Sequence, residues 1–167
     1  MSRCLLVLLL AGCGTLPSQG AGVRLALFAS DVTPPKGHPL CGGWIKPVEK
    51  VIEPLQLRGM LLEDGDTRCL IAAMDWCVLR GSAYDKLRIE LARSAGIDPA
   101  FVALHLTHTH SAPIADLRAE ELMAATSKPL KHLDLEWFGR ITAQAGDAVR
   151  GALTRWQPVT QVGYGQA

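Results

Sequence analysis

Apolar runs separated by strong turn signals restrict this chain to a narrow set of folds. The runs 55–63 and 67–77 flank Asp64-Gly65-Asp66, and an Asp-Gly step between two such runs predicts a β-hairpin. The stretch 69–74 is apolar at every position, which is typical of a strand buried on both faces. The hairpin is therefore expected at the centre of a β-sheet.

One strand and a long loop are expected before this hairpin. Residues 23–30 form a β-rich apolar run, and Pro34-Pro35 ends it because proline cannot continue a central strand. Residues 36–54 carry further prolines and glycines and no periodic pattern. Loops of this length in compact domains are often functional.

A helix and another strand should follow the hairpin. Ser82 and Asp85 indicate the helix start, and Gly96 indicates its end. Asp98-Pro99 then turns the chain into the apolar stretch 101–107, which we also interpret as a buried strand.

The last third of the chain predicts a long helix. Asp134 is a good N-cap, an apolar stripe follows at helical spacing, and Pro158 ends the pattern. A further strand is expected to begin at 159–164. Strands alternating with helices indicate an α/β fold, with a mixed sheet and helices packed on its faces. Since the last strand is barely begun, we expect an incomplete domain.

Composition excludes several classes of partner. The 167 residues are 49% hydrophobic and 20% charged, with a net charge of +1, which is typical of one globular domain. No basic excess is present to attract nucleic acid, and no apolar stretch is long enough for a membrane span. The sequence does not specify an oligomeric state.

The first residues have the pattern of an export signal. Arg3 precedes an apolar run, and Leu10-Ala11-Gly12-Cys13 resembles a bacterial lipobox. We therefore assign residues 1–22 to a leader and linker, with Cys13 lipidated as a membrane attachment. This predicts a secreted, periplasmic or lipid-anchored protein at the bacterial envelope. The alternative is a misassigned start codon before a cytoplasmic protein.

Three cysteines remain in the mature part of the chain: Cys41, Cys69 and Cys77. Their number is odd and none has CxxC spacing, so they predict no disulfide framework. We interpret Cys69 and Cys77 as small core residues, because both lie in an apolar run.

The segment Thr107-His108-Thr109-His110-Ser111-Ala112-Pro113 carries the clearest chemical signal. Residues two apart in an extended chain point to the same side, so His108 and His110 should project together after a buried strand. Two imidazoles supply half of a tetrahedral zinc shell. The neighbouring hydroxyl groups are suited to orienting the rings.

The other histidines are expected in different environments. His105 should point to the opposite face from His108, as a hydrogen-bonded core residue. His38 and His132 lie in polar, turn-rich surroundings and are expected at the surface.

The segment THTHSAP resembles THTHSGP of the neutral/alkaline ceramidase family. Asp31-Val32-Thr33-Pro34-Pro35 is similar to that family's DITPP, and Glu53-Pro54-Leu55 to its HDPL step. The strand ending in Met74-Asp75 also resembles a family strand that ends in aspartate. The resemblance runs from about residue 23 to residue 167, which we take as the amino-terminal part of a ceramidase-like domain.

This resemblance implies a zinc enzyme that hydrolyses an N-acyl amide bond, in the family ceramide to sphingosine and fatty acid. It implies that His108 is a zinc ligand. His110 becomes a candidate for outer-shell support or proton handling. Asp75 becomes a candidate catalytic partner of either ring, with a backbone cap as the alternative role. The family's other ligands and its catalytic serine follow later, so this chain alone should bind zinc weakly and show no turnover.

Departures from the family leave the substrate open between a lipid and another small amide. Ile52 or Glu53 replaces a family histidine, and Ala112 replaces a glycine. One alternative is a different HxH metal-dependent hydrolase of the amidohydrolase or metallo-β-lactamase type. Another is an inactive, lipid-anchored binding domain.

Overall fold

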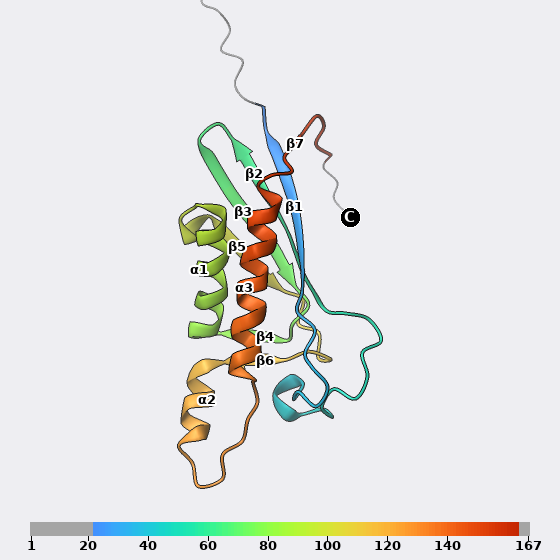
Figure 1. The fold of residues 1–167 in the computed structure, drawn as a ribbon, viewed down its shortest axis with the longest axis vertical. Coiled ribbons are helices and arrows are strands. Elements are labelled where there is room, and N and C mark those ends of the chain that lie inside the picture. Colours follow the sequence, from blue (N-terminus) through green and yellow to red (C-terminus); the bar gives the residue numbers. More distant parts are fainter. Residues whose placement is uncertain (1–21, 164–167) are drawn as a thin grey trace, which may run out of the picture.

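The computed structural model describes residues 22–163, and its framework is one five-stranded mixed sheet (Figure 1). The strand order is β5-β3-β2-β1-β7. Strand β5 runs parallel to β3, and the other neighbours are antiparallel. The strands are β1 (Arg24–Asp31), β2 (Gln56–Asp64), β3 (Thr67–Met74), β5 (Val102–Leu106) and β7 (Gln157–Pro158).

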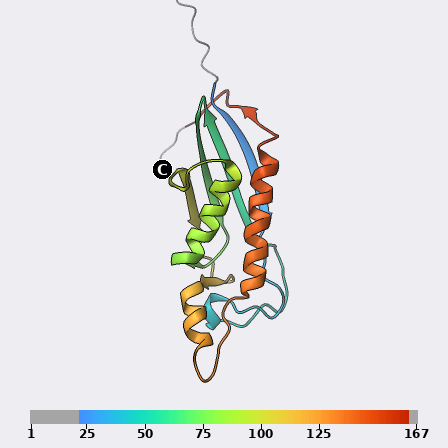
Figure 2. The same ribbon diagram turned by 60° about the vertical axis from the view of Figure 1, so that its left-hand side comes forward.

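Two long helices, α1 (Gly81–Ala95) and α3 (Leu135–Ala152), lie on the same face of this sheet (Figures 1 and 2). The core lies between these two layers. Its fully buried members include Leu61 and Leu70 from the strands and Leu91 and Phe138 from the helices. The predicted α/β class with a mixed sheet is confirmed.

The opposite face of the sheet is not covered by a described helix. Leu27 is 59% exposed and Ile71 is 44% exposed, and β3 and β5 alternate between buried and exposed residues. The expectation that both strands are buried on both faces was wrong, because both helices pack on one side.

Local signals placed most element boundaries correctly. Strand β2 pairs with β3 so that Asp64 lies opposite Thr67 across the predicted turn. Gly96 ends α1 in the left-handed conformation, with φ of 68°. The Asp134 side chain caps α3 by accepting two backbone hydrogen bonds. The predicted start of α1 was wrong, because Arg80 is the N-cap and contributes no side-chain bond.

Several short elements outside the five-stranded sheet were not predicted from the sequence. Strands β4 (Val78–Arg80) and β6 (Ile114–Asp116) pair in parallel as a second, two-stranded sheet. Helix α2 (Leu117–Ala124) follows directly. Two short 3₁₀ turns, η1 (Cys41–Gly43) and η2 (Pro99–Phe101), complete the order.

The carboxyl-terminal strand also differs from its prediction. It occupies Gln157–Pro158 and pairs with β1, whereas 159–163 form no strand. Pro158 fits there because the short strand lies at the edge of the sheet, where a missing N–H is tolerated.

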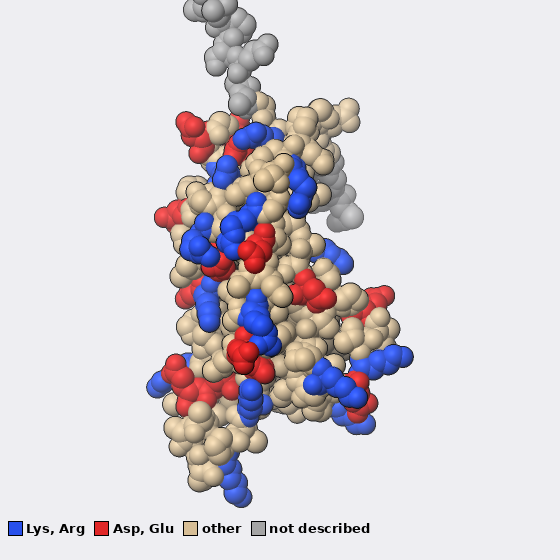
Figure 3. Space-filling view, in the orientation of Figure 1, with Lys and Arg blue, Asp and Glu red and all other residues tan. Residues whose placement is uncertain are grey.

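The described surface agrees with the balanced composition. Positive and negative residues are interspersed over the face seen in Figure 3. Among the described residues, no helix combines the length and the apolar character needed to cross a bilayer. The predicted leader, residues 1–22 with Cys13, lies outside the described residues except for Gly22.

Candidate metal centre at the ends of strands β3 and β5

Parallel pairing brings the candidate residues to one end of the sheet. Beyond the strands themselves, the Thr107 N–H donates to the Met74 carbonyl at 3.0 Å, and the His108 N–H donates to the Trp76 carbonyl at 3.1 Å. The two segments then pair again as β4 and β6. The connections between the two sheets therefore lie side by side, and they carry most of the predicted site residues.

The geometry of His108 suits a metal ligand. Its Nδ1 lies 2.8 Å from the Cys77 carbonyl oxygen. Because a carbonyl can only accept, Nδ1 carries the proton, and in the neutral ring Nε2 keeps its lone pair. Histidines that bind metals commonly donate their other ring N–H to a backbone carbonyl in this way.

The backbone at His108 is not extended as the sequence pattern had assumed. Its φ is 60°, in the left-handed region that non-glycine residues rarely adopt. The prediction that His108 and His110 lie together is nevertheless confirmed. Their ring centroids are 5.2 Å apart in an edge-to-face contact.

A second group of donors lies beside this pair. Among residues 22–163, Cys41, Cys77 and His110 place one ligand atom each within 4.8 Å of one another. The two Sγ atoms are 3.9 Å apart. Both thiols are buried, whereas His110 is exposed. Burial is the main cause that raises the pKa of the Cys77 thiol, and the Cys41 thiol adds to it.

Sequence reasoning missed Cys41 as a candidate. It reaches this place because its N–H donates to the Ala112 carbonyl at 2.8 Å. That bond joins the long loop to the segment after β5, and no local sequence pattern predicts it. Cys77 is buried as predicted, while Cys69 is only half-buried.

Asp75 makes the contacts expected of a backbone cap, which was the alternative to a catalytic role. Its Oδ2 accepts from the Gln56 N–H at 3.0 Å, and its own N–H donates to the Gln56 carbonyl at 2.9 Å. Asp75 thus closes the open end of the β2–β3 pairing. Within the described part of the chain, no hydrogen bond joins it to His108 or His110. Its catalytic role therefore stays a prediction.

Two of the remaining histidines depart from their predicted environments. His105 is exposed on the open face of the sheet, because no helix within residues 22–163 packs there. His38 is buried at 4% exposure, since its ring packs edge-on against Trp137 at 4.8 Å. His132 is half-buried.

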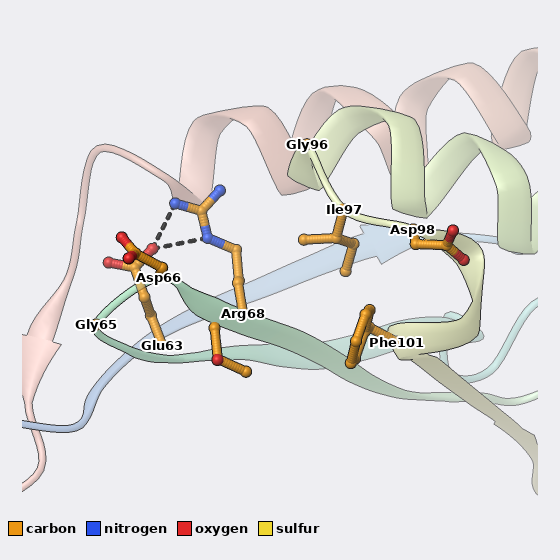
Figure 4. Close-up of a pocket in the computed structure, with 9 residues that line it drawn as sticks. Glu63, Gly65, Asp66, Arg68, Gly96, Ile97, Asp98 and Phe101 are labelled. Carbon is orange, nitrogen blue, oxygen red and sulfur yellow. Dashed lines mark hydrogen bonds and ion pairs between the residues drawn. The ribbon is translucent and has the colours of Figure 1, made fainter.

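An open groove of about 500 Å³ borders the candidate centre at Ser111. Its apolar lining includes Val48, Val51, Ile52 and Leu55 from the long loop and its end. A pocket of about 440 Å³ lies at the opposite end of β3 and β5 (Figure 4). There Glu63 is paired with Arg68, and the pocket does not border the histidines.

The donor set fits zinc. Imidazole nitrogen and thiolate sulfur are the ligands that zinc prefers in proteins. His108 presents an unprotonated nitrogen, and Cys41, Cys77 and His110 present two sulfurs and one nitrogen within a small volume. These features define an α/β domain with a candidate metal centre at the ends of its parallel strands.

Solved structures with this fold include two ceramidases. Neutral ceramidase from Pseudomonas aeruginosa matches with a TM-score of 0.59 and 18% identity, over 82% of this chain and 22% of that chain. A ceramidase complexed with C2 matches with a TM-score of 0.55 and 16% identity, over the same shares. The chain therefore spans about a fifth of the length of these structures. No family model matches the sequence, and no curated protein is significantly similar to it.

Proposed function

We propose that this chain forms the amino-terminal part of a zinc-dependent hydrolase that cleaves the N-acyl amide bond of a ceramide-like lipid. The observation that carries the proposal is the position of His108. It follows a parallel strand in a fold shared with two ceramidases, and its Nδ1–H is fixed by the Cys77 carbonyl. In the neutral ring, that bond leaves the lone pair of Nε2 available to bind a metal ion.

The proposed roles follow from the contacts around this ring. Zinc bound here would acidify a water molecule and polarise the amide carbonyl. His108 contributes one ligand, and the resemblance assigns the remaining ligands and the catalytic serine to later segments of such a hydrolase. His110, exposed and in contact with His108, would take or give a proton. Asp75 holds the end of β3 through Gln56.

The groove beside Ser111 supports an apolar substrate. Its loop lining combines aliphatic residues with the charged Lys46, Glu49, Lys50 and Glu53. The aliphatic part suits the hydrocarbon chain of a lipid amide, and the charged part suits a polar head group. Ile52 and Glu53, either of which stands at the place of a family histidine, both line the same groove, and Ile52 is 89% exposed. We propose that the substrate's chain lies here and its amide lies toward His108. Secretion or a lipid anchor at Cys13 would bring the domain to such substrates.

Fatty-acid release from a short-chain ceramide by the product of the complete gene tests this function. We expect His108→Ala to lower kcat/KM by about 100-fold or more, because removing even outer-shell support of a metal costs 10–100-fold. His105→Ala is the matched control, since His105 is exposed on β5, the strand before His108, and lies on the open face of the sheet. Unchanged turnover in His108→Ala would contradict the proposal. A folded wild-type enzyme without amide hydrolysis would favour the binding-domain alternative.

A further inference from the structure

We propose that Cys41, Cys77 and His110 form a second zinc site, separate from His108 and contained wholly within this chain. The inference extends the metal chemistry of the proposed function and reassigns His110 from proton handling to metal binding. It does not depend on amide hydrolysis, because its tests measure bound metal.

Three separate segments converge to build this group. Cys41 belongs to the long loop, Cys77 follows β3, and His110 follows β5. Backbone hydrogen bonds hold them together, with Cys41 donating to Ala112 at 2.8 Å and Cys77 donating to Pro113 at 3.2 Å. The donors are therefore placed by the fold, and no rearrangement of the strands is needed to bring them within 4.8 Å.

The chemistry of the donors selects the ion. Two thiolates and one imidazole form a known catalytic zinc set that leaves one position for water. Softer sulfur ligands disfavour magnesium and calcium, which take oxygen ligands. Because His110 is exposed and both cysteines are buried, the vacant position would face solvent on the histidine side.

The backbone at Cys41 adopts a conformation that is unusual for a residue other than glycine. Its φ is 46°, and Gly42 and Gly43 follow with φ of 67° and 88°. A non-glycine residue in this region costs on the order of 1–3 kcal/mol and persists where the surroundings fix it, often at functional sites. With this backbone, the thiol of Cys41 lies within 3.9 Å of the Cys77 thiol, in a small buried cluster that also includes Ala112.

The reduced 167-residue chain, loaded with Zn²⁺ or Co²⁺, provides the test. We expect one metal ion per chain and, with Co²⁺, a thiolate-to-cobalt charge-transfer band. Cys41→Ser, Cys77→Ser and His110→Ala should each weaken binding by about 100-fold or more, beyond the 10–100-fold typical of outer-shell changes. Since His110 is exposed, its substitution leaves the buried packing intact, and circular dichroism confirms the fold of each variant.

Two matched controls separate this site from the others. Cys69→Ser should keep both the stoichiometry and the charge-transfer band, because Cys69 lies within β3. His108→Ala should also keep the band, whereas the proposed hydrolase would lose activity. The inference is overturned if wild-type protein binds cobalt without a thiolate band or binds no metal. Two other results would also overturn it. One is loss of metal in His108→Ala while the cysteine and His110 variants keep it, and the other is a Cys41–Cys77 disulfide in place of metal.

Discussion

His38 connects the long loop to the start of α3 as a neutral ring. Its Nδ1 lies 2.7 Å from the Pro39 carbonyl, and its Nε2 accepts from the Asp134 N–H at 3.3 Å. Burial lowers its pKa below the ordinary value of 6.5. This effect outweighs the hydrogen bond to the Pro39 carbonyl and the charges of Asp134 and Glu120, which raise the pKa. Lys131 lowers it further.

A pH-dependent stability follows from this lowered pKa. As the pH falls, His38 becomes protonated in the unfolded chain at about pH 6.5 and in the folded chain only at a lower pH. The stabilisation is therefore present above that pH and lost as the pH falls toward the folded-state pKa. Urea unfolding of wild type and His38→Phe at about pH 7.5 and 5.5 checks this. The free energy of unfolding of the variant should fall less between the two pH values than that of wild type. Equal losses would show that folding does not lower the pKa of His38.

Gly59, on β2, has no room for a side chain. An added Cβ would collide with the Phe28 ring and lie 2.7 Å from the Ile71 carbonyl oxygen. We expect Gly59→Ala to destabilise the fold by about 1–3 kcal/mol, as overpacking does. Gly139→Ala on α3 is the control, because nothing lies within 4 Å of its added Cβ and alanine favours a helix by about 1 kcal/mol. Chemical denaturation should show opposite signs, and two equal effects would refute the close approach.

Residue-level chemistry was only partly predictable from the sequence. The histidine pair stood out because its spacing and the preceding strand are local features. Cys41 did not, since a single backbone bond to Ala112 brings it there from the distant loop. His105 was misjudged because the sequence does not say which face of the sheet the helices cover.

Among the elements, α3 depends most on one capping residue. The Asp134 carboxylate accepts from the Glu136 and Trp137 N–H groups, each at 3.1 Å. Asp134→Ala should cost about 1 kcal/mol in the free energy of unfolding. Glu136→Ala is the control, because it removes only an exposed pair with Arg140, worth about 0.3–0.5 kcal/mol. Thermal unfolding that ranks the two variants the other way would contradict the cap.

Elements with local signals were predicted, and those defined by distant partners were not. The Asp-Gly turn, Gly96 and Asp134 each mark a boundary by their own chemistry. Strands β4 and β6 are three residues each and exist through their mutual pairing, so no periodicity reveals them. Helix α2 is only eight residues long. Its N-cap, Asp116, accepts from the Ala119 N–H, and this residue is the local signal in the sequence that marks the start of the helix.

At the scale of the molecule, one face of the sheet presents an apolar row. Leu27, Met60 and Ile71 lie opposite one another across β1, β2 and β3, and all three are exposed. The chain should therefore bind a hydrophobic dye such as anilinonaphthalene sulfonate, because contiguous exposed apolar surface is rare in monomers.

Substitutions on this row should reduce the dye signal. The double change Leu27→Thr and Ile71→Thr keeps β-favouring residues and removes aliphatic surface. Ile89→Thr, at an isolated exposed position of α1, is the control and should leave the fluorescence nearly unchanged. If both variants behave alike, the signal arises elsewhere than on the open face.

The centre at the ends of β3 and β5 is most directly tested by X-ray absorption at the zinc edge of the reduced, zinc-loaded chain. We expect two sulfur neighbours at about 2.3 Å and at least one histidine nitrogen at about 2.0 Å. A shell of oxygen and nitrogen alone, or protein that retains no zinc after desalting, would contradict it.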